Sequence, residues 1–159
     1  MALYDRYLYA LDGVIDEKQG EPFALRVFDL ANPLQPVEVT KIPVPDMMPH
    51  VYSDILADQR YLYINIMPQT LIVFDLANPS QPVRVATHAI MIGGVADLEK
   101  DENTLVLDSV MTDDVSDIMK PTMSGYTRLI LEAWSYDRVG NLIYVATRSH
   151  GLYIFPYTP

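Results

Sequence analysis

The chain has 159 residues, no cysteine and a net charge of −10, from 11 Lys and Arg against 21 Asp and Glu. This acidic balance argues against nucleic-acid binding, which needs a basic surface, and against attraction to anionic lipid. Half of the residues are hydrophobic, and no apolar run approaches the roughly 18 residues of a membrane span. Residues 1–6 lack the pattern of a signal peptide. A length of 159 residues suits a single folded domain, which we expect over residues 1–159.

Two copies of one sequence pattern occupy the first half of the chain. Residues 6–39 contain Arg-Tyr-Leu-Tyr, then a loop, then Val-Phe-Asp-Leu-Ala-Asn-Pro-Leu-Gln-Pro-Val. Residues 60–85 repeat both words with one change, so Asp29 and Asp75 occupy equivalent positions. A recurring aspartate directly after a strand is expected to accept hydrogen bonds from the backbone of the following turn.

A third, degenerate copy and a fourth, shorter copy follow. Residues 114–121 stand where Asp-Leu-Ala-Asn-Pro-x-Gln-Pro is expected, and residues 141–146 and 152–155 match the two strand words again. Phe28, Phe74, Asp113 and Phe155 are then equivalent. A period of about 40–45 residues with several strands per unit is typical of β-propeller blades.

The local chemistry of the second unit predicts four short strands. Aromatic and β-branched residues favour strands at 61–64, 71–74 and 83–86, and a fourth strand is expected at 95–98. The polar run 99–103 is expected to form the turn that closes this strand. Four strands per unit, joined by tight turns, make a blade.

The words at 27–37, 73–83 and 143–155 resemble the LVIVD repeat, a propeller-forming repeat of bacterial and archaeal proteins that are often secreted or on the cell surface. Pro156 stands where the fourth copy should have its aspartate, and the third copy lacks the phenylalanine and the first turn proline. The resemblance implies a propeller fold and an extracellular or periplasmic location. It implies no particular activity, because the family is a scaffold without a common function.

The repeat units are expected at about 6–54, 55–97, 98–135 and 136–159, an all-β fold of three and a half to four four-stranded blades. With strand A innermost, the chain is expected to begin at a B strand and end at a C strand. Three arrangements remain open. The chain is part of a longer propeller, or it completes a ring by pairing with a second copy, or it closes alone with four blades.

Histidine and methionine suggest a metal site on the face that carries the B–C and D–A loops. His50, His88 and His150 fall in or beside these loops, as do seven of the eight methionines. Histidine and methionine bind copper, and histidine binds zinc. The histidines are far apart in sequence, and the alternative is that they are ordinary polar turn residues while the methionines fill irregular packing.

Segment 111–126 is expected to be a long loop that interrupts the repeat and belongs to the same face. Such loops often carry recognition, so Met111, Asp113, Asp114, Asp117 and Met119 are the candidate binding residues. The three aspartates also suggest a calcium site, although their spacing is not that of an EF-hand loop. A solvated acidic loop is the simpler interpretation.

The tyrosines of the repeated strands admit two interpretations. They could form a platform for a glycan or peptide, but because they recur with the blade, packing between neighbouring blades is favoured. These tyrosines are Tyr7, Tyr9, Tyr61, Tyr63 and Tyr144. No nucleophile elbow or phosphate-binding turn is recognisable in the sequence.

The sequence therefore favours a non-catalytic propeller scaffold that presents a loop face to a protein or glycan partner, with self-association completing a larger ring. The alternative is a metal-dependent enzyme with a His/Met site at the mouth of the channel. No cofactor is expected under the first hypothesis; copper, zinc or calcium is expected under the second.

Overall fold

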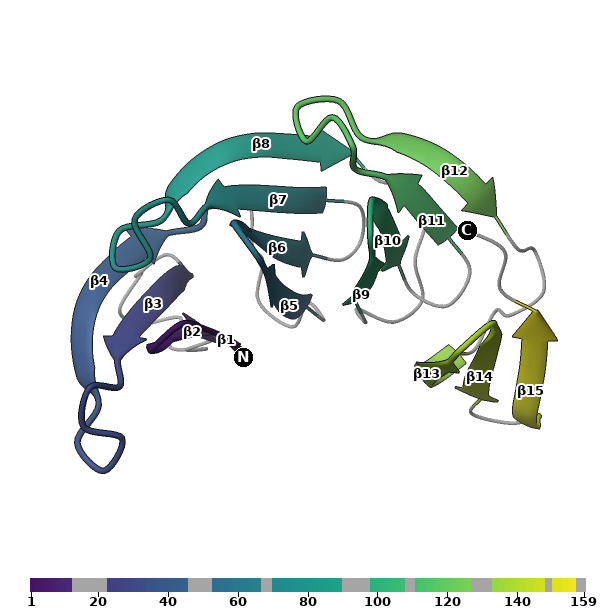
Figure 1. The fold of residues 1–159 in the computed structure, drawn as a ribbon, viewed down its shortest axis with the longest axis horizontal. Coiled ribbons are helices and arrows are strands. Elements are labelled where there is room, and N and C mark those ends of the chain that lie inside the picture. Colours follow the sequence, from purple (N-terminus) through teal and green to yellow (C-terminus); the bar gives the residue numbers. More distant parts are fainter. Residues whose placement is uncertain are drawn as a thin grey trace.

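The chain is an all-β protein in the computed structural model. The structure describes residues 1–12, 23–45, 53–66, 70–89, 98–107, 111–126, 133–147 and 150–156. Within these ranges the strands form four antiparallel sheets, which follow one another in an open arc with the first and fourth at its two ends (Figure 1). The prediction of repeated blade-like sheets in an all-β chain is therefore confirmed.

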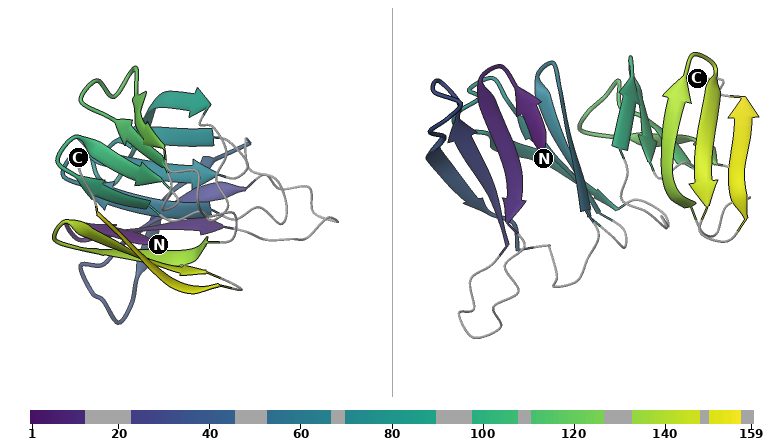
Figure 2. Two further views of the ribbon diagram at one scale, coloured as in Figure 1. Left: turned by 90° about the vertical axis from the view of Figure 1, so that its right-hand side faces the viewer. Right: turned by 90° about the horizontal axis from the view of Figure 1, so that it is seen from below.

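Each sheet consists of strands that are consecutive in the sequence, with the first strand nearest the middle of the arc and the last outermost (Figures 1 and 2). The first sheet contains β1 (Ala2–Tyr4), β2 (Tyr7–Asp12), β3 (Ala24–Asp29) and β4 (Val37–Pro43), and the second contains β5 (Ser53–Asp58), β6 (Tyr61–Ile66), β7 (Thr70–Asp75) and β8 (Val83–Ala89). The third contains β9 (Leu98–Asp101), β10 (Thr104–Leu107), β11 (Met111–Asp114) and β12 (Thr122–Tyr126), and the fourth contains β13 (Ala133–Val139), β14 (Leu142–Thr147) and β15 (Gly151–Pro156).

Two expectations about the innermost strands were wrong. The chain begins at an innermost strand, because β1 pairs with β2 through Leu3 and Leu8. The run 99–103 is not a turn, because its first three residues belong to β9 and only Glu102 and Asn103 form the turn to β10. Of the strand expected at 95–98, only Leu98 lies among the described residues.

A two-residue turn joins the first two strands of every sheet. Its first residue has a positive φ in each case: 53° at Asp5, 48° at Gln59, 49° at Glu102 and 63° at Gly140. Tight hairpins need this left-handed geometry, because it matches the twist of the flanking strands. The turn before Tyr7 was missed in the sequence because Asp5 is not a glycine.

The strand register confirms the alignment of the four copies. Leu8 pairs with Phe28, Leu62 with Phe74, Leu105 with Asp113 and Ile143 with Phe155. A register shift directly before the third-strand residue of this pair occurs in each of the first three sheets, at Phe28, Phe74 and Asp113. The units therefore repeat in their irregularities as well as in their strands.

The core lies between sheets rather than within one layer. A first cluster joins the first two sheets and includes Tyr9, Leu25 and Val27 packed with Leu62 and Phe74. A second cluster joins the second and third sheets, and a third joins the third and fourth. Because residues alternate between the two faces of a strand, each sheet uses one face for the preceding sheet and the other for the following sheet.

Candidate binding surfaces

The repeated aspartates are turn residues, as expected. Asp29 accepts a hydrogen bond from the backbone N–H of Ala31 at 2.8 Å, and Asp75 accepts one from Ala77 at 2.7 Å. Each also binds an arginine of the preceding hairpin turn, Arg6 at 2.9 Å and Arg60 at 2.6 Å. The hydrogen bond from Arg60 lowers the pKa of Asp75. The recurrence of Arg before Tyr-Leu-Tyr was the sequence signal for this pairing.

Segment 111–126 is not a loop that interrupts the repeat. It forms β11 and β12, joined by a turn in which the N–H of Lys120 donates to the carbonyl oxygen of Asp117, as Gln35 and Gln81 do to Asn32 and Asn78 in the first two units. Asp114 accepts from the N–H of Ser116 at 2.8 Å, which lowers its pKa, and Asp117 accepts from the N–H of Met119 at 3.0 Å. The degenerate sequence hid this because Ile118 stands where the other units have proline.

This turn also lies at the other end of the sheet from the expected loop face. It joins the third and fourth strands, and the expected face carries the connections after the second and fourth strands. Of the candidate binding residues, Asp114 and Asp117 have turn roles, and Met119 has an exposed side chain. Met111 lies in β11, and its side chain is outside the described set. A hard-cation site built from these aspartates stays a prediction.

Asp113 occupies a core position. Its side chain is 5% exposed, and it stands in β11 where Phe28, Phe74 and Phe155 stand in the other sheets. Burial raises its pKa, and the nearby His88 acts in the opposite direction. The structure therefore brings together two residues that the sequence analysis had assigned to separate sites.

The three candidate metal-binding histidines have different settings. His88 lies in β8, with its Nε2 at 3.3 Å from the carbonyl oxygen of Ile118, and His150 precedes β15 in the fourth sheet. His50 is outside the described residues. In the part of the chain that the structure describes, no three or more His, Asp or Glu side chains gather as metal ligands. No described helix is long and apolar enough to cross a membrane.

A small hollow of about 180 Å³ lies between the second and third sheets, at the end with the tight turns. Tyr61 and Tyr63 line it together with Arg60 and Lys100. Both cations are already paired, Arg60 with Asp75 and Lys100 with Asp58. The hollow therefore offers aromatic and neutral polar surface rather than an uncompensated charge.

The tyrosines divide as the packing interpretation predicts. Tyr9 and Tyr63 are buried between sheets, which raises the pKa of both hydroxyls, and the hydroxyl of Tyr9 donates to the carbonyl oxygen of Pro79 at 2.9 Å. Tyr7 and Tyr61 pack at the edges of the same clusters. Tyr144 is the equivalent of Tyr9 and Tyr63 in the fourth sheet, because all three pair with the same position of the third strand.

The fourth sheet carries an apolar face that nothing in the described chain covers. Ile143, Val145 and Phe155 pack toward the third sheet. By alternation, Tyr144, Leu152 and Ile154 point the other way, and we call these three residues the forward face of the fourth sheet. Leu152 is 62% exposed and Ile154 54%, whereas the equivalent Leu25 and Val27 of the first sheet are both 0% exposed.

Comparisons with protein-family models, with curated proteins and with solved structures find no significant match for this chain. The resemblance to the LVIVD repeat therefore rests on the residues quoted above.

Proposed function

We propose that this chain is a non-catalytic β-propeller scaffold of the LVIVD type, whose function depends on association through its sheet faces. The single observation that carries the proposal is the exposed forward face of the fourth sheet. Its residues match positions that form the core between the other sheets. Exposed contiguous apolar surface of this kind marks sites of protein association.

Association supplies the burial that a repeat unit cannot achieve alone. A blade has two apolar faces, and each is stable in water only when another sheet covers it. The first and fourth sheets lie at opposite ends of the arc, so each has one face without a described neighbour (Figure 1). A larger ring would cover both faces and would hold the loop face toward a protein or glycan partner.

The test is a charge placed on the forward face. Ile154→Lys should shift the association equilibrium toward the monomer by at least about tenfold, because it puts a cation into an apolar contact. Val83→Lys is the matched control, since Val83 is 61% exposed on the outermost strand β8. Sedimentation velocity over a range of concentrations measures both. Equal behaviour of the two variants and the wild type would contradict the proposal.

A further inference from the structure

The contacts between the innermost strands follow one rule at the joints within the arc. Lys100 of β9 binds Asp58 of β5 at 2.7 Å, and Arg138 of β13 binds Asp101 of β9 at 3.0 Å. Lys100 and Arg138 hold the same position in their strands, since they pair with Leu105 and Ile143. The acidic partners share the last position of their strands. A residue of one sheet thus contacts a fixed position of the preceding sheet.

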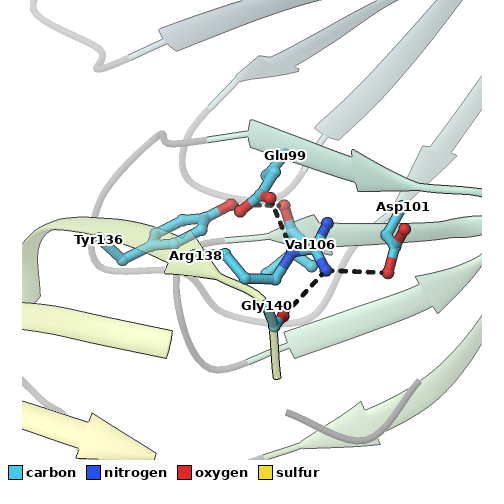
Figure 3. A network of polar contacts seen from close by, with 6 residues as sticks. All are labelled: Glu99, Asp101, Val106, Tyr136, Arg138 and Gly140. Carbon is cyan, nitrogen blue, oxygen red and sulfur yellow. Dashed lines mark hydrogen bonds and ion pairs between the residues drawn. The ribbon is translucent and has the colours of Figure 1, made fainter. Parts of the chain in front are cut away.

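At the joint of the first and second sheets the same two positions carry Ala57 and Tyr4, and both pack on the apolar cluster there. Each joint therefore holds a chemically matched pair: apolar with apolar, then Lys with Asp, then Arg with Asp. Figure 3 shows the last of these, with Arg138 also bound to Glu99 and the hydroxyl of Tyr136 donating to the carbonyl oxygen of Val106.

Two of these positions are left at the ends of the arc. Leu3 holds the position of Ala57, Lys100 and Arg138, and Val139 holds the position of Tyr4, Asp58 and Asp101. Leu3 is 60% exposed and Val139 is 62% exposed. Both are apolar, so they match one another by the rule of the three internal joints.

The remaining positions of the two end faces also match. In the first sheet, Leu8 and Phe28 point away from the second sheet, because Tyr9 and Val27 beside them pack toward it. Leu30 follows β3 at the position that Leu76 holds after β7, and we call these three residues with Leu3 the rear face of the first sheet. They are partly exposed, whereas their equivalents Leu62, Phe74 and Leu76 are at most 2% exposed. Between the first two sheets, Tyr9, Leu25 and Val27 cover the surface that contains Leu62, Phe74 and Leu76. The forward face of the fourth sheet presents the same kinds of side chain at the equivalent positions: a tyrosine, a leucine and a β-branched residue.

We propose that the forward face of the fourth sheet binds the rear face of the first sheet of a second copy of this chain. Two such joints, related by a twofold axis, close a ring of eight sheets, within the range of about four to eight blades of known propellers. In each joint Val139 meets Leu3 of the second copy, and the hydroxyl of Tyr144 donates to the carbonyl oxygen of Pro33, as Tyr9 does to Pro79. This inference rests on the proposed function and specifies its partner and register.

The second copy is favoured over other occupants because the chain itself contains the complement of each end. An unrelated protein would have to reproduce the repeat register, with an apolar side chain opposite Val139 and a carbonyl opposite Tyr144. The two ends of the arc stand apart within one chain in Figure 1 and in the right view of Figure 2, so the matching residues meet most directly between two chains.

The proposed register is tested by introducing, at the positions of Leu3 and Val139, the Lys–Asp pair that Lys100 and Asp58 form within the chain. Leu3→Lys and Val139→Asp would each place one charge opposite an apolar residue, and each should weaken the dimer by at least about tenfold. Mixing the two variants should restore the dimer to within about threefold of wild type. The mixed dimer has one Lys–Asp joint like that of Lys100 and Asp58, and one native Leu–Val joint.

Val83→Asp, on an outermost strand, is the control for a general effect of the added charge, and thermal unfolding of each variant checks that it is folded. Rescue on mixing cannot arise from a folding defect. If the wild type dimerises but neither variant weakens the dimer, or mixing gives no rescue, the head-to-tail register is wrong while association stands. If the wild type is monomeric at every concentration, the proposed function fails as well.

Discussion

At the scale of single residues, Asp113 is the clearest departure from the repeat. The other sheets place a phenylalanine at this position, and the structure keeps the aspartate at 5% exposure beside His88. The free energy needed to remove a carboxylate from water is expected to exceed its favourable interaction with one neighbouring histidine. The residue therefore costs stability at neutral pH.

Replacing the carboxylate tests this directly. Asp113→Leu should raise the free energy of unfolding at pH 7 by about 1–3 kcal/mol, because an apolar side chain suits the site. The pH dependence has a defined sign. The pKa of Asp113 is raised in the folded state, so the native state holds the proton more strongly, and stability falls as pH rises from about 4 through the folded pKa.

Asp113→Asn should lack this fall, and the difference between wild type and Asp113→Asn removes the contributions of the other carboxylates. Urea titrations between pH 4 and 8 measure it. A loss of stability in Asp113→Leu would show instead that the interaction with His88 outweighs the desolvation.

At the scale of the elements, the joints between sheets carry the interactions that sequence reasoning missed. The polar run 99–103 was expected to be a turn that closes the preceding strand, and its charged residues 99–101 are of types that are depleted in strands. In the structure these residues form β9, and their charges are satisfied by Asp58 on one side and Arg138 on the other. The partners are 37 to 42 positions away in the sequence, which places the reason for the strand outside any local window.

Arg138 should therefore contribute more to the free energy of unfolding than an arginine whose ion pair lies within one sheet. Arg138→Ala leaves Glu99 and Asp101 without this partner at a partly buried joint, and it should lower the free energy of unfolding by about 1–3 kcal/mol. Arg60→Ala is the control, because the Arg60 side chain is 62% exposed and its partner Asp75 belongs to the same sheet, so its effect should be smaller. Denaturant unfolding compares them, and equal losses would show that the joint adds nothing.

At the scale of the whole molecule, the repeat in the sequence predicted the blade-like sheets, and the observed strand register agrees with its alignment of the four copies. The equivalence of Phe28, Phe74 and Asp113 depends on short words at a regular period, and such words specify strands and turns locally. The first strand β1 and the strand character of 111–126 were missed, because Asp5 and Ile118 lack the glycine or proline that marks a turn. The packing of tyrosines between sheets was predicted, but the ion pairs between sheets could not be, because they depend on which faces meet in three dimensions.

The exposed apolar faces at the two ends of the arc indicate that the chain associates with another copy. Apolar side chains of the kind that fill the core between sheets are exposed or partly exposed at both ends: Leu152 and Ile154 at one end, Leu3 and Phe28 at the other. Their burial in a second copy would repeat joints that the chain already forms internally.

The most direct measurement is the solution mass of the wild-type chain, by light scattering coupled to size exclusion over a range of concentrations. One chain has a mass of 18.0 kDa, and the closed ring predicts a species of twice this mass that does not grow further with concentration. A monomer at all concentrations would contradict association through the sheet faces. Steady growth beyond the dimer would contradict closure of the ring by two copies.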